Sequence, residues 1–110
     1  MTIRTQSVHF DADAKLLEFI QKKVTKLEHF FDRIISADVI MQLEKTAQVQ
    51  DKVSEVRLQV PGAVLFAKET CKTFEEGIDL AVESLSRQLA KHKEKQRTHD
   101  VIDTDRLAAD

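Results

Sequence analysis

The sequence predicts an α+β domain with the order β-α-β-β-β-α, in which two helices pack on one face of a four-stranded sheet. Three observations predict this class: two segments with apolar residues at helical spacing, segments of strand-type composition or alternation, and a Pro-Gly turn at residues 61–62. The 110 residues are 42% apolar, which is enough for one hydrophobic core without disulfides or metals.

The first part of the chain predicts a strand, a helix and a second strand. Residues 3–10 contain β-branched and aromatic side chains without helical spacing, which is typical of a strand. Asp11 or Asp13 then offers an N-cap, and apolar residues three and four apart predict a helix ending near Phe31. Residues 35–45 alternate between apolar and polar, which predicts a half-buried strand. The stripe of the helix is Leu16, Leu17, Ile20, Val24, Leu27 and Phe31.

The middle of the chain predicts a hairpin. Residues 53–60 place Val56, Leu58 and Val60 on one face, and the dipeptide Pro61-Gly62 follows as a turn. Residues 63–71 pair naturally with the preceding strand. Together with residues 35–45 they predict three successive antiparallel strands.

A second helix is predicted to begin after Thr73. Thr73 and Glu76 have the spacing of a capping box, in which the hydroxyl and the carboxylate each accept a backbone N–H. Its apolar stripe is Phe74, Ile78, Ala81, Val82, Leu85 and Leu89. The next positions on that face are His92 and Gln96, so the stripe ends before the helix does.

Charge is unevenly distributed along the chain, although the formal net charge is only −2. Residues 87–99 hold five Lys or Arg and one Glu, whereas residues 100–110 hold four Asp and one Arg. We therefore divide the chain into an α+β domain, residues 1–99, and an acidic, flexible tail, residues 100–110.

The cations of the two helices predict a surface for nucleic acid. Arg87 and Lys91 lie opposite the second stripe, and further cations surround the helix beyond its last apolar residue. On the first helix Lys15, Lys22 and Lys26 share the solvent face, with Lys23 at its flank. Two helices on one face of the sheet would join these cations into one surface that suits a phosphate backbone. The simpler alternative is a solvated helix end whose cations interact with the helix dipole.

Other classes of function find little support in the sequence. Cys71 has no partner for a disulfide and no catalytic signature, and the four histidines lack metal-ligand spacing. Glu75 and Glu76 are explained by the N-terminus of a helix. No signal peptide or apolar run of membrane-spanning length occurs, which predicts a cytoplasmic protein. We expect no enzyme activity, cofactor, metal, membrane contact or small-molecule substrate.

The chain resembles the short ribosome hibernation-promoting factors and the related ribosome-associated translation inhibitor. The residues that carry the resemblance are KLEHFFDRI (26–34), the VPGA turn (60–63), the helix start at Phe74–Asp79 and LSRQLAKHKEKQ (85–96). They occur in the family's order, and the likeness extends without large gaps from about residue 3 to 97.

The resemblance implies a factor that acts by occupancy. It would bind 16S rRNA in the decoding region of the small ribosomal subunit, block the tRNA sites and the mRNA path, and keep ribosomes inactive under stress or in stationary phase. The positions that match the family's rRNA contacts, with phosphate neutralisation as their expected role, are Lys22, Lys23, Lys26, Arg33, Arg87, Lys91, His92, Lys93 and Lys95.

Two questions stay open at this point. Many relatives carry a second domain that joins two ribosomes, but only an acidic segment follows the second helix here, so we do not expect this chain to pair ribosomes through such a domain. The need for a helper protein in pairing is the first open question. Whether the chain promotes or opposes pairing is undecided. The alternative functions are a general binder of double-stranded RNA, or a protein–protein module that modulates a transcription factor through its exposed sheet or its tail.

Overall fold

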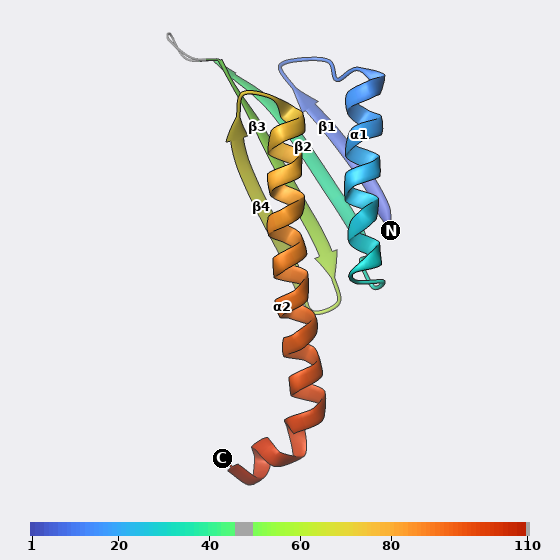
Figure 1. The fold of residues 1–110 in the computed structure, drawn as a ribbon, viewed down its shortest axis with the longest axis vertical. Helices are drawn as coiled ribbons and strands as arrows, with labels where there is room; N and C mark the ends of the chain where they lie inside the picture. The colour runs from blue at the N-terminus through green and yellow to red at the C-terminus, as the bar shows by residue number, and fades with distance from the viewer. Residues whose placement is uncertain (46–49, 110) are drawn as a thin grey trace.

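A four-stranded sheet carries two helices on one of its faces (Figure 1). The computed structural model describes the backbone of residues 1–45 and 50–109, and the side chains of residues 1–44 and 51–94. The predicted α+β class and the order β-α-β-β-β-α are confirmed. The elements are β1 (Thr2–Val8), α1 (Ala14–Thr25), the short 3₁₀ helix η1 (Lys26–His29), β2 (Ser36–Lys45), β3 (Gln50–Val60), β4 (Ala63–Cys71) and α2 (Phe74–Ala109).

The sheet has the strand order β1-β2-β3-β4. β2, β3 and β4 are antiparallel neighbours, as the alternation predicts, and Gly62 has the positive φ of +83° that a Pro-Gly turn requires. β1 is parallel to β2, because the chain returns to the starting end of β1 through α1 before β2 begins. β4 and β1 are therefore the two edges of the sheet.

Side-chain caps fix where both helices begin. Asp13 is the N-cap of α1, and its carboxylate accepts the Leu16 N–H at 2.8 Å. Thr73 Oγ accepts the Glu76 N–H at 3.1 Å, which is the hydroxyl half of the predicted capping box. These bonds satisfy backbone donors that have no partner inside the helix.

The first helix is shorter than its periodicity predicts. It ends as an α-helix at Thr25, and the expected continuation to Phe31 is wrong because the chain tightens into η1. There the Phe30 and Phe31 N–H groups both donate to the Leu27 carbonyl at 3.1 Å. Leu27 and Phe31 remain buried, so the apolar stripe survives the change of helix type.

The hydrophobic core lies between the helices and the sheet. Both predicted stripes face it, except that Leu17 is 36% exposed. α2 lies close to β3 because Gly77 has no side chain: a Cβ there would lie 2.8 Å from Ser54 Oγ. The largest fully buried apolar side chains are Ile20, Leu27, Met41, Leu58, Ile78, Leu85, Leu89, Val24, Val39 and Val56.

α2 continues well beyond the sheet, and its distal turns project past the end of the domain (Figure 1). The helix includes residues 100–109, where the sequence predicts an acidic tail. The flexibility of that tail stays a prediction, since its side chains lie outside the described residues. Within the described part of the chain, no helix combines the length and the apolar character needed to cross a membrane.

Candidate nucleic-acid interface

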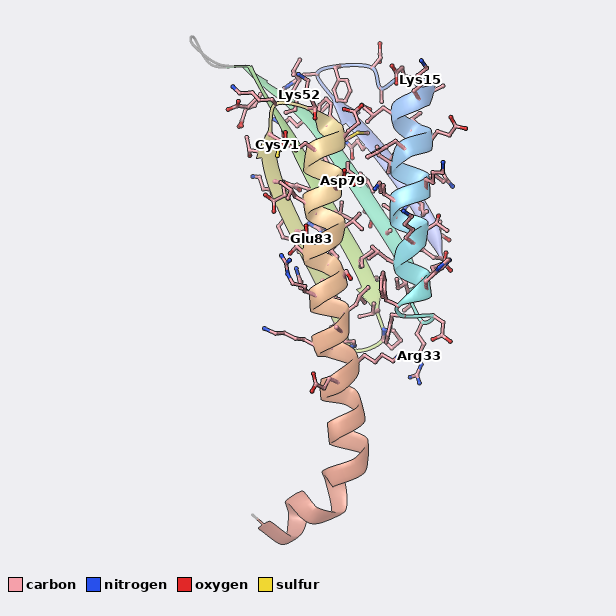
Figure 2. The ribbon with its side chains drawn as sticks, in the orientation of Figure 1. Lys15, Arg33, Lys52, Cys71, Asp79 and Glu83 are labelled. Carbon is pink, nitrogen blue, oxygen red and sulfur yellow. The ribbon has the colours of Figure 1, made fainter. Side chains whose placement is uncertain are left out.

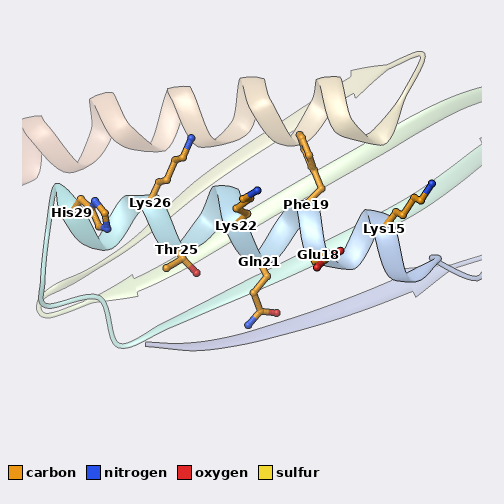
Figure 3. A pocket seen from close by; sticks show the side chains of 8 residues that line it. All are labelled: Lys15, Glu18, Phe19, Gln21, Lys22, Thr25, Lys26 and His29. Atoms are coloured by element: carbon orange, nitrogen blue, oxygen red, sulfur yellow. The ribbon is translucent and has the colours of Figure 1, made fainter.

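The solvent side of α1 carries a shallow open groove with cations along it. Its lining comes from successive turns of the helix: Lys15, Glu18, Phe19, Gln21, Lys22, Thr25, Lys26 and His29. Figure 3 shows Phe19, Lys22 and Lys26 extending to the same side of the helix. Phe19 is partly buried and packs against the core. The α1 groove therefore combines aliphatic lysine stems with charged ends.

α2 separates its charges along its length. The first turns carry the acids Glu75, Glu76, Asp79 and Glu83, and the described cations follow only from Arg87 onward. The acids of the first turn suit the helix dipole, which favours anions near the N-terminus. The cations from Arg87 to Lys93 lie in the middle of the helix, which ends at Ala109, so the dipole does not explain them. The surface on which cations of both helices lie together is consequently limited to one end of the domain, while Lys15 in the first turn of α1 lies at the other end (Figure 2).

Two cations on the helices are held by acids of α2. Lys23 Nζ lies 2.9 Å from Asp79 Oδ1 and 5.5 Å from the centre of the Phe19 ring, so it connects α1 to α2. Arg87 Nη1 lies 3.1 Å from Glu83 Oε1 one turn earlier on its own helix. The side chains of this second pair are 69% and 64% exposed, so the pair contributes little to stability and Arg87 remains accessible.

We use the term basic end for the exposed cations of the last turn of α1, of η1, of the loop before β2 and of α2 from Arg87 to Lys93. Figure 2 shows Arg33 of that loop at the opposite end of the domain from Lys52. The basic end consists of Lys22, Lys26, Arg33, Arg87, Lys91 and Lys93. Apart from Arg87, none of these cations makes an ion pair with a described side chain. The side chain of Lys95 lies outside the described residues.

His92 has a different environment from its basic neighbours. Its ring meets that of Phe31 edge-on, with 5.8 Å between the centroids and 71° between the planes. Its Nε2 is buried and has no hydrogen-bond partner among the described residues. His92 therefore holds α2 against the end of η1, in keeping with its position on the apolar face. Its direct contact with rRNA stays a prediction.

Replacing His92 with Phe tests which role dominates. We expect the free energy of unfolding to stay within about 1 kcal/mol of the parent value, since the aromatic contact remains and a buried nitrogen without a partner is removed. Urea denaturation followed by circular dichroism measures this. Binding to ribosomes should change less than about threefold; a much larger loss, at unchanged stability, would favour a direct contact with rRNA instead.

Sequence reasoning missed the acids that restrain two of the predicted contacts. The pair of Glu83 and Arg87 has the i, i+4 spacing that favours ion pairs on a helix, so a signal was present. The pair of Lys23 and Asp79 joins residues far apart in the chain, and only the packing of the two helices reveals it.

Among the described residues, neither a reactive cysteine nor a cluster of metal ligands competes with the basic end as a candidate site. Burial and, secondarily, the carboxylates of Glu76 and Glu69 raise the pKa of the Cys71 thiol, which disfavours the nucleophilic thiolate. No three His, Cys, Asp or Glu side chains within the described ranges gather as metal ligands would. The basic end is the best-supported candidate site.

The sequence matches a known family over most of its length. Residues 3–97 fit the family described as Sigma 54 modulation protein / S30EA ribosomal protein. The ribosome hibernation promoting factor of Azotobacter vinelandii is 38% identical over 96 residues, which cover 87% of this chain and 86% of the relative. The protein of the same name from Escherichia coli strain K12 is 36% identical over 84 residues, or 76% of this chain and 84% of the relative.

Solved structures show the same fold. A ribosomal subunit interface protein from Coxiella burnetii superposes with a TM-score of 0.76 at 23% identity, over 86% of this chain and 99% of that protein. The N-terminal domain of Thermus thermophilus Protein Y gives a TM-score of 0.73 at 20% identity, over 84% of this chain and 99% of that domain. The fold is thus shared by chains with few identical residues.

Proposed function

Because this chain belongs to the family described as Sigma 54 modulation protein / S30EA ribosomal protein, we propose that it is a ribosome hibernation factor, as its relatives' names indicate. It binds 16S rRNA in the decoding region of the small subunit and covers the tRNA sites and the mRNA path. Ribosomes held in this way stay inactive but intact in the cytoplasm during stress or stationary phase. The mechanism is occupancy, without catalysis or a cofactor.

The observation that carries this proposal is the basic end. Exposed cations from α1, the loop before β2 and α2 meet there, and most of them make no ion pair with a described side chain. Such cations can neutralise phosphates and release the counterions condensed on RNA. Arg33 and Arg87 suit bidentate contact with phosphate oxygens, whereas the lysines act as point charges. Lys95, one turn beyond Lys91, extends the same role along α2.

Arg87 can exchange its partner at small cost. Its ion pair with Glu83 is largely exposed to water, and such pairs contribute about 0 to 1 kcal/mol. A phosphate of the rRNA can therefore replace the Glu83 carboxylate.

The two helices present their cations in a fixed arrangement. Lys23 in the last turn of α1 and Asp79 near the start of α2 connect the two helices, and the ring contact of Phe31 with His92 connects the segment after η1 to α2 near the basic end. A fixed arrangement lowers the entropy that is lost when the cations meet phosphates. We therefore assign Lys23 and His92 a positioning role in rRNA binding.

A salt series of sedimentation experiments with purified small subunits tests the proposal. Six phosphate contacts predict a loss of affinity of roughly a thousandfold between 50 and 200 mM salt. Bound mRNA with tRNA should also block the chain from binding. Binding that is insensitive to salt and to tRNA would contradict the proposal and favour a protein–protein module, while equal affinity for any RNA duplex would favour a general double-stranded RNA binder.

A further inference from the structure

The face of the sheet that the helices leave uncovered carries an aromatic platform on its edge strand. Side chains alternate along β4, so Leu65 and Ala67 face the helices while Val64 and Phe66 face the other way. Val64 is 59% exposed and Phe66 is 43% exposed. They are the most exposed large apolar side chains of the described strands, although Val8, Ile40 and Val53 also lie on this face by register.

Arg57 lies beside the platform. It is directly opposite Phe66 in the register of β3 and β4, and its guanidinium carbon is 5.9 Å from the centre of the Phe66 ring. On the other side of Arg57, Asp38 is engaged by Arg4 at 2.8 Å. Arg57 makes no ion pair with any described side chain, so this row of the open face keeps one positive charge next to an exposed aromatic ring.

The backbone at Phe66 is held in place from the helix layer. Gln88 of α2 donates from Nε2 to the Phe66 carbonyl at 3.0 Å, and to Ser84 Oγ at 3.1 Å. This bond occupies a carbonyl of the exposed edge, which makes addition of a strand from another chain less favourable. It also holds the backbone from which the Phe66 side chain extends.

A nucleobase fits this arrangement better than a protein does. Bases stack on exposed aromatic side chains of sheets and on guanidinium planes, and a neighbouring cation neutralises the phosphate. A stable protein interface buries roughly 1,200 to 2,000 Å². Among the described strands, Val64 and Phe66 are the only large apolar side chains with substantial exposure, and they are too few to anchor such an interface.

We propose that the open face of the sheet binds single-stranded RNA, with a base stacked on Phe66 and its phosphate near Arg57. Val64 supplies apolar surface for the adjoining sugar or base. This site goes beyond the proposed function, because it lies on the opposite face of the sheet from the two helices. It gives the chain a second contact with RNA, for a strand whose bases are not paired.

The absence of Trp and Tyr from the chain provides a direct assay. In Phe66→Trp, the introduced indole is the single strong fluorophore, and a base that stacks on it quenches its emission. We expect saturable quenching by an oligoadenylate RNA of about ten nucleotides, and none by a paired duplex of the same length, whose bases are already stacked. In a separate assay with labelled RNA, Phe66→Ala should weaken binding of the single strand roughly tenfold.

Leu80→Trp is the matched control, because Leu80 is 39% exposed but belongs to α2. Equal quenching of both variants, or no quenching of Phe66→Trp at millimolar RNA, would overturn the inference. Circular dichroism verifies that both variants are folded. Sedimentation with small subunits is a separate readout. If RNA quenches Phe66→Trp but the chain does not sediment with small subunits, the proposed function is contradicted and this inference stands. If the chain sediments with small subunits but RNA does not quench Phe66→Trp, this inference is contradicted and the proposed function stands.

Discussion

Replacing Lys26 and Lys91 together with alanine is expected to weaken binding to the small ribosomal subunit roughly 100-fold at about 0.1 M salt. Each lysine is exposed, belongs to a different helix and makes no ion pair with a described side chain. Each is therefore able to release about one counterion equivalent when it meets a phosphate, which corresponds to about tenfold in affinity at that salt concentration. The dependence of log affinity on log salt should become shallower by about two.

Lys52→Ala with Lys72→Ala is the matched control. It removes the same charge from the opposite end of the domain, where Lys52 donates to the Lys72 carbonyl at 3.1 Å (Figure 2). We expect its affinity for the small subunit to change less than about threefold, and both double variants to unfold at the same urea concentration as the parent. Equal losses of affinity in the two variants would indicate a nonspecific effect of net charge and would contradict the role of the basic end.

Truncating Leu85 to alanine is expected to lower the free energy of unfolding by about 2 to 5 kcal/mol. The Leu85 side chain is completely buried between α2 and the sheet, so the substitution removes apolar contacts and leaves a cavity. That loss is a large fraction of the stability of a domain of this size. Urea denaturation monitored by circular dichroism measures the change.

Leu80 provides the comparison on the same helix. Its side chain is 39% exposed, so Leu80→Ala should cost less than about 1 kcal/mol. A loss for Leu80→Ala as large as that for Leu85→Ala would mean that the buried face of α2 is misassigned, and with it the direction in which Arg87 and Lys91 point.

Periodicity predicted the elements that have one buried face. Alternation in β2 and the Pro-Gly turn after β3 were sufficient for three antiparallel strands, because a period of two and a positive φ are local properties. The pairing of β1 with β2 is not local. It depends on where α1 returns the chain, so composition alone gave a strand without its partner. The last turn of the first helix was also mispredicted, because η1 keeps Leu27 and Phe31 buried under a different hydrogen-bond pattern.

The sequence predicted which types of residue form the candidate site, but not which of its cations are paired with acids. The cluster after Arg87 is visible in the sequence, but the acids that precede it on α2 limit the basic surface to one end. The bond of Lys23 with Asp79 depends on two helices meeting in space. For His92 the apolar stripe of the second helix predicted a side chain that faces the core, whereas the family resemblance implied a contact with rRNA. The ring contact with Phe31 agrees with the first of these predictions.

Hydroxyl-radical footprinting of 16S rRNA in small subunits, with and without the protein, tests the central claim most directly, since it reports where the RNA backbone is covered. The account predicts protection of backbone in the decoding region by the parent chain, and loss of that protection with Lys26→Ala and Lys91→Ala at the same protein concentration. Protection confined to other parts of the subunit, or none at saturating protein, would contradict it.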